Sequence, residues 1–244
     1  MNASPEPPPM VINRAAERIR DQLVSGELLP GQRLSEVALS ASLGISRNSL
    51  REVFRLLTKE GLLRHLPNRG VSVAVPSMAS IIDIYRVRRM VECQALAQAI
   101  AQHPARQQMR EAVAEQRRLA QAGRWQDVGT ANMRFHQAVV ALADSERLDA
   151  LFAHLLVELR LAFGMLRDAE FLHAPYVEMN AAILERFEAG DMRRAADLLL
   201  EYLTHSERAV LSVHARRVGD AEAVPPALPR GRRNLSKHPL KQAQ

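Results

Sequence analysis

Apolar side chains recur every three or four residues over about residues 10–25, a spacing that places them on one face of a helix. Gly26 ends this helix. Ser35 and Ser46 are then placed to cap a second helix, ending near Gly44, and a third, ending near Gly61. Three short helices are therefore predicted within the first sixty or so residues.

The apolar pattern changes from a helical to an alternating spacing after the third helix. Residues 62–66 and 71–75 predict two short strands, the second with valine at every other position. Asn68 and Gly70 lie between the strands, and both residue types tolerate the positive φ angles of a tight turn. Three helices followed by a hairpin describe a winged helix-turn-helix domain.

Almost all of the remaining chain shows helical spacing, interrupted by glycine, proline and Asp-Ser breaks. One predicted break is at His173–Pro175. The predicted fold is mainly α: the winged domain followed by an all-α bundle of about six helices. The helices are expected over residues 77–102, 104–122, 125–143, 145–168, 174–189 and 191–217.

The predicted domains are a winged helix-turn-helix over 10–75 and a helical domain over 77–217. Residues 1–9 and 218–244 have too little apolar periodicity to pack and are expected to be disordered tails. The second tail is basic, and a solvated end is favoured there over an arm that binds DNA.

The bulk composition narrows the class of partner. The net charge of +6 and the pI of about 10.2 suit a polyanion, whereas an aromatic content of 4% does not favour binding by base stacking. The single cysteine, Cys93, excludes disulfide frameworks and thiolate zinc sites within one chain, and fits a cytoplasmic location. No apolar run is long enough to span a membrane, so no membrane partner is expected.

The basic residues of the predicted third helix gather at its N-terminal end, the end that major-groove readers use. Arg47 is the candidate for a bidentate contact to guanine. Arg33 and Arg51 are better placed for phosphates, and Arg69 at the tip of the hairpin for the minor groove. The full predicted DNA-binding set is Arg33, Ser46, Arg47, Asn48, Ser49, Arg51, Arg69 and Gly70.

Four sequence segments of this domain resemble the N-terminal domain of the GntR family of bacterial transcription regulators. They are Leu29-Pro-Gly-Gln-Arg-Leu-Ser-Glu36, Leu43-Gly-Ile-Ser-Arg47, Leu50-Arg-Glu52 and Leu56-Leu-Thr-Lys-Glu-Gly61. The resemblance implies a homodimer that binds a short palindromic operator in double-stranded DNA. Asn48, and Asn68-Arg69 in the hairpin, depart from the family pattern and bear on which bases are read.

The second half resembles the FadR-type (FCD) effector domain of the same family. The segments that carry this likeness are Arg88-Arg-Met-Val-Glu92, Asn132-Met-Arg-Phe-His136 and Leu184-Glu-Arg-Phe-Glu-Ala-Gly-Asp191. Most members of this branch hold a divalent metal with one Asp and three His. At the matching positions this chain has Asn132, His136, Asn180 and Tyr202, so we expect no metal or other cofactor. A metal held by His136 and His205 is the alternative.

The predicted effector-binding residues are Arg88, Asn132, His136, Asn180 and Tyr202, around a pocket for a small organic acid or similar metabolite. A buried hydrogen-bond network that has replaced the metal as a structural element is the competing interpretation. His154, His173 and His214 are expected at the surface or in caps.

The sequence therefore predicts a ligand-responsive transcription regulator, with repression as the expected outcome. A constitutive DNA-binding dimer with no effector is the alternative. An enzyme is not expected, because the chain has no nucleophile motif, no HExxH and no phosphate-binding glycine loop.

Overall fold

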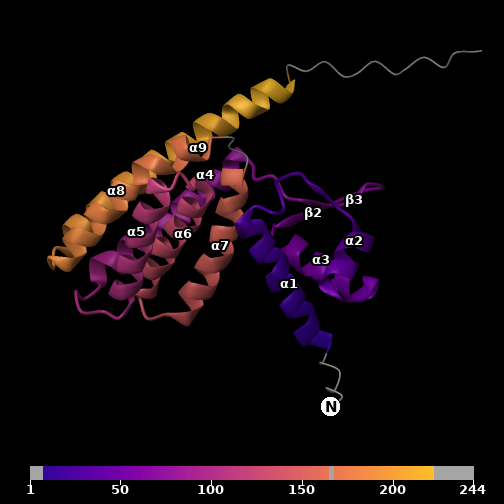
Figure 1. Cartoon of the computed structure of the whole chain (residues 1–244), viewed down its shortest axis with the longest axis horizontal. Coiled ribbons are helices and arrows are strands. Elements are labelled where there is room, and N and C mark those ends of the chain that lie inside the picture. The colour runs from indigo at the N-terminus through magenta and orange to yellow at the C-terminus, as the bar shows by residue number, and fades with distance from the viewer. Residues whose placement is uncertain (1–7, 165–167, 223–244) are drawn as a thin grey trace, which may run out of the picture.

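The computed structural model describes residues 8–164 and 168–222. Figure 1 shows a small N-terminal domain beside a larger domain of long helices. The predicted fold class, a winged helix-turn-helix followed by an all-α bundle, is confirmed. Of the predicted tails 1–9 and 218–244, residues 1–7 and 223–244 lie outside the described residues. Residues 8–9 and 218–222 are helical, which corrects the prediction that they are disordered.

The N-terminal domain has the predicted order of three helices and a hairpin, with one further short strand. Its elements are α1 (Pro8–Ser25), β1 (Arg33–Leu34), α2 (Glu36–Leu43), α3 (Arg47–Lys59), β2 (Leu63–Leu66) and β3 (Gly70–Val73).

Local capping fixes the two central helices of this domain as the sequence predicts. The Ser35 side chain accepts a hydrogen bond from Ala38 N, and the Ser46 side chain accepts one from Ser49 N. Gly44 ends α2 with φ of 68°, a left-handed conformation that glycine adopts without steric cost. The turn between α2 and α3 is therefore set by two local residues, Gly44 and Ser46.

The strand β1 is not predicted by the pattern, because two residues are too few to show a period. It pairs antiparallel with β3, which lies between β1 and β2 in the sheet. Leu34 is buried opposite Val71, whereas its neighbour Arg33 is exposed. The sheet thus fixes the direction of Arg33.

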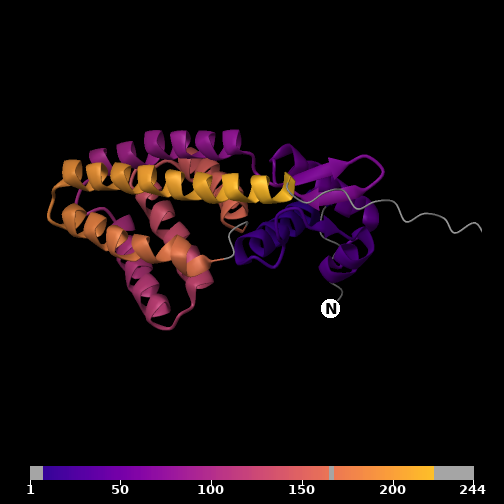
Figure 2. The same cartoon turned by 90° about the horizontal axis from the view of Figure 1, so that it is seen from above.

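The C-terminal domain is formed by helices that pack along one another (Figure 2). They are α4 (Met78–Gln98), α5 (Ala105–Gln121), α6 (Trp125–Ala141), α7 (Glu146–Gly164), α8 (Ala169–Glu188) and α9 (Met192–Glu222). The last helix runs beside α4 and α8 and extends beyond the predicted end at residue 217.

The predicted helix break at His173–Pro175 is wrong. The helix α8 begins after Asp168, whose side chain accepts a hydrogen bond from Phe171 N, and it continues through Pro175. Proline costs the helix one backbone hydrogen bond. Burial of residues on both sides of it, Leu172 and Tyr176 among them, compensates for that loss.

The two domains share part of one hydrophobic core. Val157 and Leu161 on α7 belong to the same buried cluster as Ile19, Leu23 and Leu57 of the winged domain. In Figure 1, α7 accordingly lies next to α1. The winged domain is therefore docked on the helical domain through apolar contacts. No helix among the described residues is long and apolar enough to cross a membrane.

Candidate nucleic-acid interface and effector site

The N-terminal end of α3 exposes the predicted base-reading residues. Arg47 and Asn48 are exposed in the first turn. The hydroxyl groups of Ser46 and Ser49 lie 2.9 Å apart and serve the helix cap. Arg47 is thus free to reach base edges, while the cap holds the helix tip rigid.

The arginines assigned to phosphates differ in their surroundings. Arg51 is exposed and its Nε lies 3.3 Å from Glu36 Oε2, so a phosphate at this position competes with that carboxylate. Arg33 is exposed on β1. At the tip of the wing, Arg69 is exposed between Asn68 (φ 59°) and Gly70 (φ 81°), and these two left-handed residues form the turn.

The structure adds a basic residue that the sequence interpretation missed. Arg64 on β2 and Arg33 on β1 are both paired in register with Ser72 of β3, so the two arginines flank that serine on one face of the sheet. Both side chains are exposed. The segment Leu63-Arg64-His65-Leu66 does not alternate between apolar and polar residues, and only the strand pairing places Arg64 beside Arg33.

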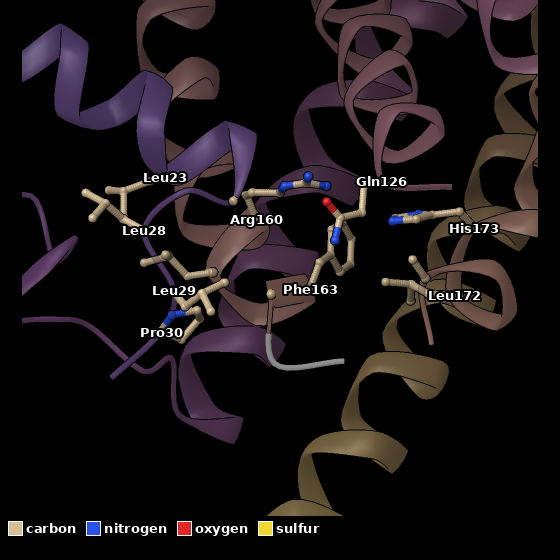
Figure 3. Close-up of a pocket in the computed structure, with 13 residues that line it drawn as sticks. Leu23, Leu28, Leu29, Pro30, Gln126, Arg160, Phe163, Leu172 and His173 are labelled. Atoms are coloured by element: carbon tan, nitrogen blue, oxygen red, sulfur yellow. The ribbon is translucent and has the colours of Figure 1, made fainter. Parts of the chain in front are cut away.

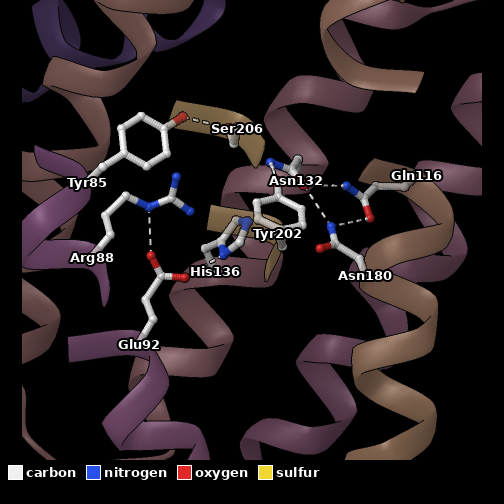
Figure 4. Close-up of polar contacts among 9 residues, drawn as sticks. All are labelled: Tyr85, Arg88, Glu92, Gln116, Asn132, His136, Asn180, Tyr202 and Ser206. Atoms are coloured by element: carbon white, nitrogen blue, oxygen red, sulfur yellow. Dashed lines mark hydrogen bonds and ion pairs between the residues drawn. The ribbon is translucent and has the colours of Figure 1, made fainter. Parts of the chain in front are cut away.

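All five predicted effector residues meet in the centre of the helical domain (Figure 4). Each is buried, with at most 5% of its surface exposed. Four further residues complete this polar centre and were not predicted as site residues: Tyr85, Glu92, Gln116 and Ser206.

One half of the polar centre is charged. The Arg88 Nε donates to Glu92 Oε1 over 2.7 Å, and His136 Nδ1 lies 2.5 Å from Glu92 Oε2. Burial opposes ionisation of Glu92, but the charge of Arg88 and the contact with His136 outweigh it and lower the pKa of this carboxyl group. Burial also lowers the pKa of His136, so its imidazole is neutral at pH 7. The positive charge of Arg88 and the negative charge of Glu92 therefore neutralise each other.

The other half of the polar centre is a cluster of amides. Asn132 Oδ1 accepts from Gln116 Nε2 at 3.0 Å and from Asn180 Nδ2 at 2.7 Å. The Tyr202 hydroxyl donates to the same Oδ1 over 3.1 Å. Burial raises the pKa of Tyr202 well above its ordinary value, so this hydroxyl keeps its proton.

This donor set does not fit a divalent metal ion. Asn132 Oδ1 already accepts three hydrogen bonds, and the protonated Tyr202 is a poor ligand. His205, the alternative second imidazole, is exposed and its Nδ1 lies 3.0 Å from the Tyr176 hydroxyl. Over the part of the chain that the structure describes, no group of three or more His, Cys, Asp or Glu side chains could hold a metal.

Two of the three histidines expected at the surface or in caps are buried. His214 Nε2 lies 2.9 Å from the Pro76 carbonyl oxygen, and His173 packs edge-on against Phe163. His154 is exposed, as predicted. The misplacement of His173 follows from the wrong break at Pro175, since a residue outside a helix was not expected to face the core.

Burial of His173 predicts a loss of stability in acid. Burial and then the nearby Arg160 lower its pKa to about 3, far below the ordinary value of 6.5. The unfolded chain therefore binds a proton that the folded chain excludes. Stability from this group is complete above pH 6.5 and decreases by up to about 1.4 kcal/mol per pH unit as the pH falls towards 3.

Urea unfolding of wild type and His173→Gln between pH 4 and 8 measures this loss. The difference between the two proteins should change with pH below 6.5 and be flat above it. The exposed His154→Gln serves as the control. A difference that does not vary with pH contradicts a neutral, buried His173.

The exposed arginines of α3 and the wing, carried by a winged helix-turn-helix, define a DNA-binding transcription regulator. Residues 11–73 match the model of the bacterial regulatory proteins of the gntR family, and residues 83–205 match the FCD domain. The chain belongs to the GntR family and carries an FCD domain.

Individual relatives agree with this assignment. A putative GntR transcriptional regulator from Rhodococcus sp. RHA1 is 35% identical, and its structure aligns with a TM-score of 0.78 over 82% of this chain and 97% of that one. The HTH-type transcriptional repressor RspR of Escherichia coli is 25% identical over 83% of this chain and 92% of that protein. The YdhC regulator of Bacillus subtilis is 33% identical over only 75 residues, so the match spans about a third of its length (34%).

Proposed function

We propose that this protein is a ligand-responsive repressor whose helical domain binds a small organic acid or similar metabolite without a complete metal site. Three atoms of the polar centre carry the proposal. Arg88 Nη2, His136 Nε2 and Asn180 Oδ1 are buried and have no hydrogen-bond partner among the described residues. A buried polar atom without a hydrogen bond lowers the stability of the folded protein. A bound molecule that forms the missing hydrogen bonds restores that stability.

The chemistry of these atoms restricts the ligand. Arg88 offers an N–H donor, whereas Asn180 Oδ1 is an acceptor. A fitting molecule therefore presents an oxygen to Arg88 and an O–H or N–H to Asn180. Since Glu92 already balances Arg88, a polar group that is neutral where it meets Arg88 fits better than a second carboxylate.

Calorimetric titration and thermal-shift screening of hydroxy acids and their amides test this proposal. A molecule present at 100 times its Kd should stabilise wild type by about 2.7 kcal/mol. Asn180→Ala should remove the response, and the exposed His154→Ala should keep it. Ligands that stabilise wild type and Asn180→Ala equally would place the effector elsewhere.

Repression by a dimer is the proposed outcome on DNA. The name of RspR as a repressor supports this direction. Operator binding should weaken or strengthen when the effector is added, because a ligand that prefers one arrangement of the bundle shifts the population towards it. If operator affinity does not respond to any molecule that stabilises the protein, the constitutive DNA-binding alternative replaces this proposal.

Chelation is expected to leave the folded protein unchanged. An aspartate offers a charged carboxylate and a histidine an imidazole nitrogen to Zn, Ni or Mn. The neutral amide oxygen of Asn132 and the protonated hydroxyl of Tyr202 are much weaker ligands. EDTA should therefore not shift the melting temperature of the freshly purified protein. A decrease that added Zn or Ni reverses would instead support the site at His136 and His205.

A further inference from the structure

A pocket with several polar groups in its lining lies between the two domains, away from the polar centre of the bundle (Figure 3). One wall is the end of α1 and the turn through Leu28, Leu29 and Pro30 of the winged domain. The opposite walls come from α6, α7 and α8, which supply Gln126, Arg160 and His173 respectively. The cavity measures about 80 Å³. Since one water needs roughly 10–15 Å³, it has room for a small molecule.

Arg160 lines this cavity as a buried cation. It is 7% exposed, and within residues 8–164 and 168–222 its guanidinium forms no hydrogen bond or ion pair. Asp127 is the acidic residue that acts on it, but the Asp127 carboxylate is hydrogen-bonded to Arg124 Nε at 2.7 Å. An arginine keeps its charge under all ordinary conditions, so this positive charge is buried without a carboxylate of the described residues in contact with it.

The other polar groups of the cavity converge on the same point. In Figure 3 the guanidinium of Arg160 and the ring of His173 point towards each other, with the Gln126 amide beside them. Gly129 on α6 makes this approach possible. A Cβ atom there would lie 2.5 Å from His173 Nε2 and 2.9 Å from Arg160 Nη1. Glycine inside a helix lowers stability relative to alanine, and here it clears space for two polar side chains.

We propose that this interdomain cavity binds a small oxyanion, a carboxylate group or an inorganic phosphate, with Arg160 as its cationic partner and His173 and Gln126 as hydrogen-bonding neighbours. A planar guanidinium binds such groups through two parallel hydrogen bonds. The neutral imidazole adds one N–H, and the Gln126 amide adds further donors.

The two polar sites of the protein differ in charge, which determines the ligand that each accepts. In the bundle, Glu92 neutralises Arg88 over 2.7 Å. In the interdomain cavity, the guanidinium of Arg160 has no such carboxylate. An anion is therefore suited to the cavity at Arg160, where it removes the cost of an unpaired buried charge.

Occupancy of this cavity bears on DNA binding because both domains form its walls. Pro30 of the winged domain lies close to α7, where a Cβ atom on Gly164 would come within 3.1 Å of Pro30 Cδ. The anion stabilises the arrangement in which both walls are in place, and so it favours the docked position of the winged domain. The helices α6 and α8 also carry Asn132 and Asn180 of the polar centre, so the same two helices contribute side chains to both sites.

Isothermal titration of the full chain with inorganic phosphate and with succinate, in a buffer free of both, tests the proposal. Wild type should bind at least one of them saturably at one site per chain. Arg160→Met should weaken this binding at least tenfold, and Gly129→Ala should do the same because its methyl group occupies the space between Arg160 and His173. Arg134→Met, which removes an exposed arginine of α6 that does not line the cavity, is the matched control and should bind as wild type does.

Thermal melting separates this role from a structural one. Without an anion, Arg160→Met should melt no lower than wild type, since it removes an unpaired buried charge, and only wild type should gain stability from the anion. The proposal is overturned if wild type binds neither anion, or if Arg160→Met binds as well as wild type. Binding that survives Arg160→Met but is lost in Asn180→Ala would assign the anion to the polar centre of the bundle instead.

Discussion

Substitution of Glu92 by glutamine is expected to lower the free energy of unfolding by about 3–5 kcal/mol. Glu92 is fully buried and contacts both Arg88 and His136. Without its charge, the Arg88 guanidinium stays buried with no compensating anion. Chemical denaturation followed by circular dichroism measures the change, and loss of the folded protein on expression is the extreme form of the same result.

Two control variants decide whether the charge causes the loss. The double variant Arg88→Met/Glu92→Leu removes both charges and should recover most of the stability, because apolar replacement of a buried ion pair is often neutral. Glu115→Gln breaks an exposed ion pair with Arg118 on α5 and should leave the unfolding midpoint unchanged. If Glu92→Gln is as stable as wild type, then the charge of Glu92 does not stabilise the buried Arg88, and the charge balance inferred for the polar centre is wrong.

Substitution of Arg47 by alanine is expected to weaken operator binding by about fivefold to more than a hundredfold, since a bidentate pair with guanine discriminates by about 1–3 kcal/mol. Arg47 is exposed in the first turn of a helix whose tip is fixed by the Ser46 cap. The loss should be confined to specific DNA. Selection of binding sites from random DNA, followed by competition with substituted sites, should show relaxed preference at the base position that Arg47 reads.

Arg33→Ala is the matched variant for contacts with the phosphate backbone. Arg33 and Arg64 flank Ser72 on the sheet, so each should weaken binding to all sequences and reduce the slope of log affinity against log salt by about one. Equal effects of Arg47→Ala and Arg33→Ala on specific and random DNA would contradict the division between base-reading and positioning arginines.

The DNA-binding domain could be predicted closely because its signals are local. The serine caps, the left-handed Gly44 and the helical spacing before Gly26 each act within a few residues. The short strand β1 escaped prediction, because only pairing with β3 defines it. Pro175 was mistaken for a helix end, because the burial that outweighs its local cost comes from other helices.

The candidate sites were predicted less completely. Arg88, Asn132, His136, Asn180 and Tyr202 meet as expected, but their partners Glu92 and Gln116 were not recognised as parts of the same centre. Arg160 and His173 gave no signal at all, since neither belongs to a motif. Their convergence on Gly129 depends on how α6, α7 and α8 pack.

The sequence by itself determined the helices, the hairpin and the basic tip of the DNA-reading helix. Capping, glycine turns and apolar spacing are properties of neighbouring residues, and they need no knowledge of the rest of the chain. Only the tertiary structure decided which polar groups satisfy one another and which remain unpaired. Whether a charge such as that of Arg88 or Arg160 finds a partner is set by side chains that packing brings together from distant helices.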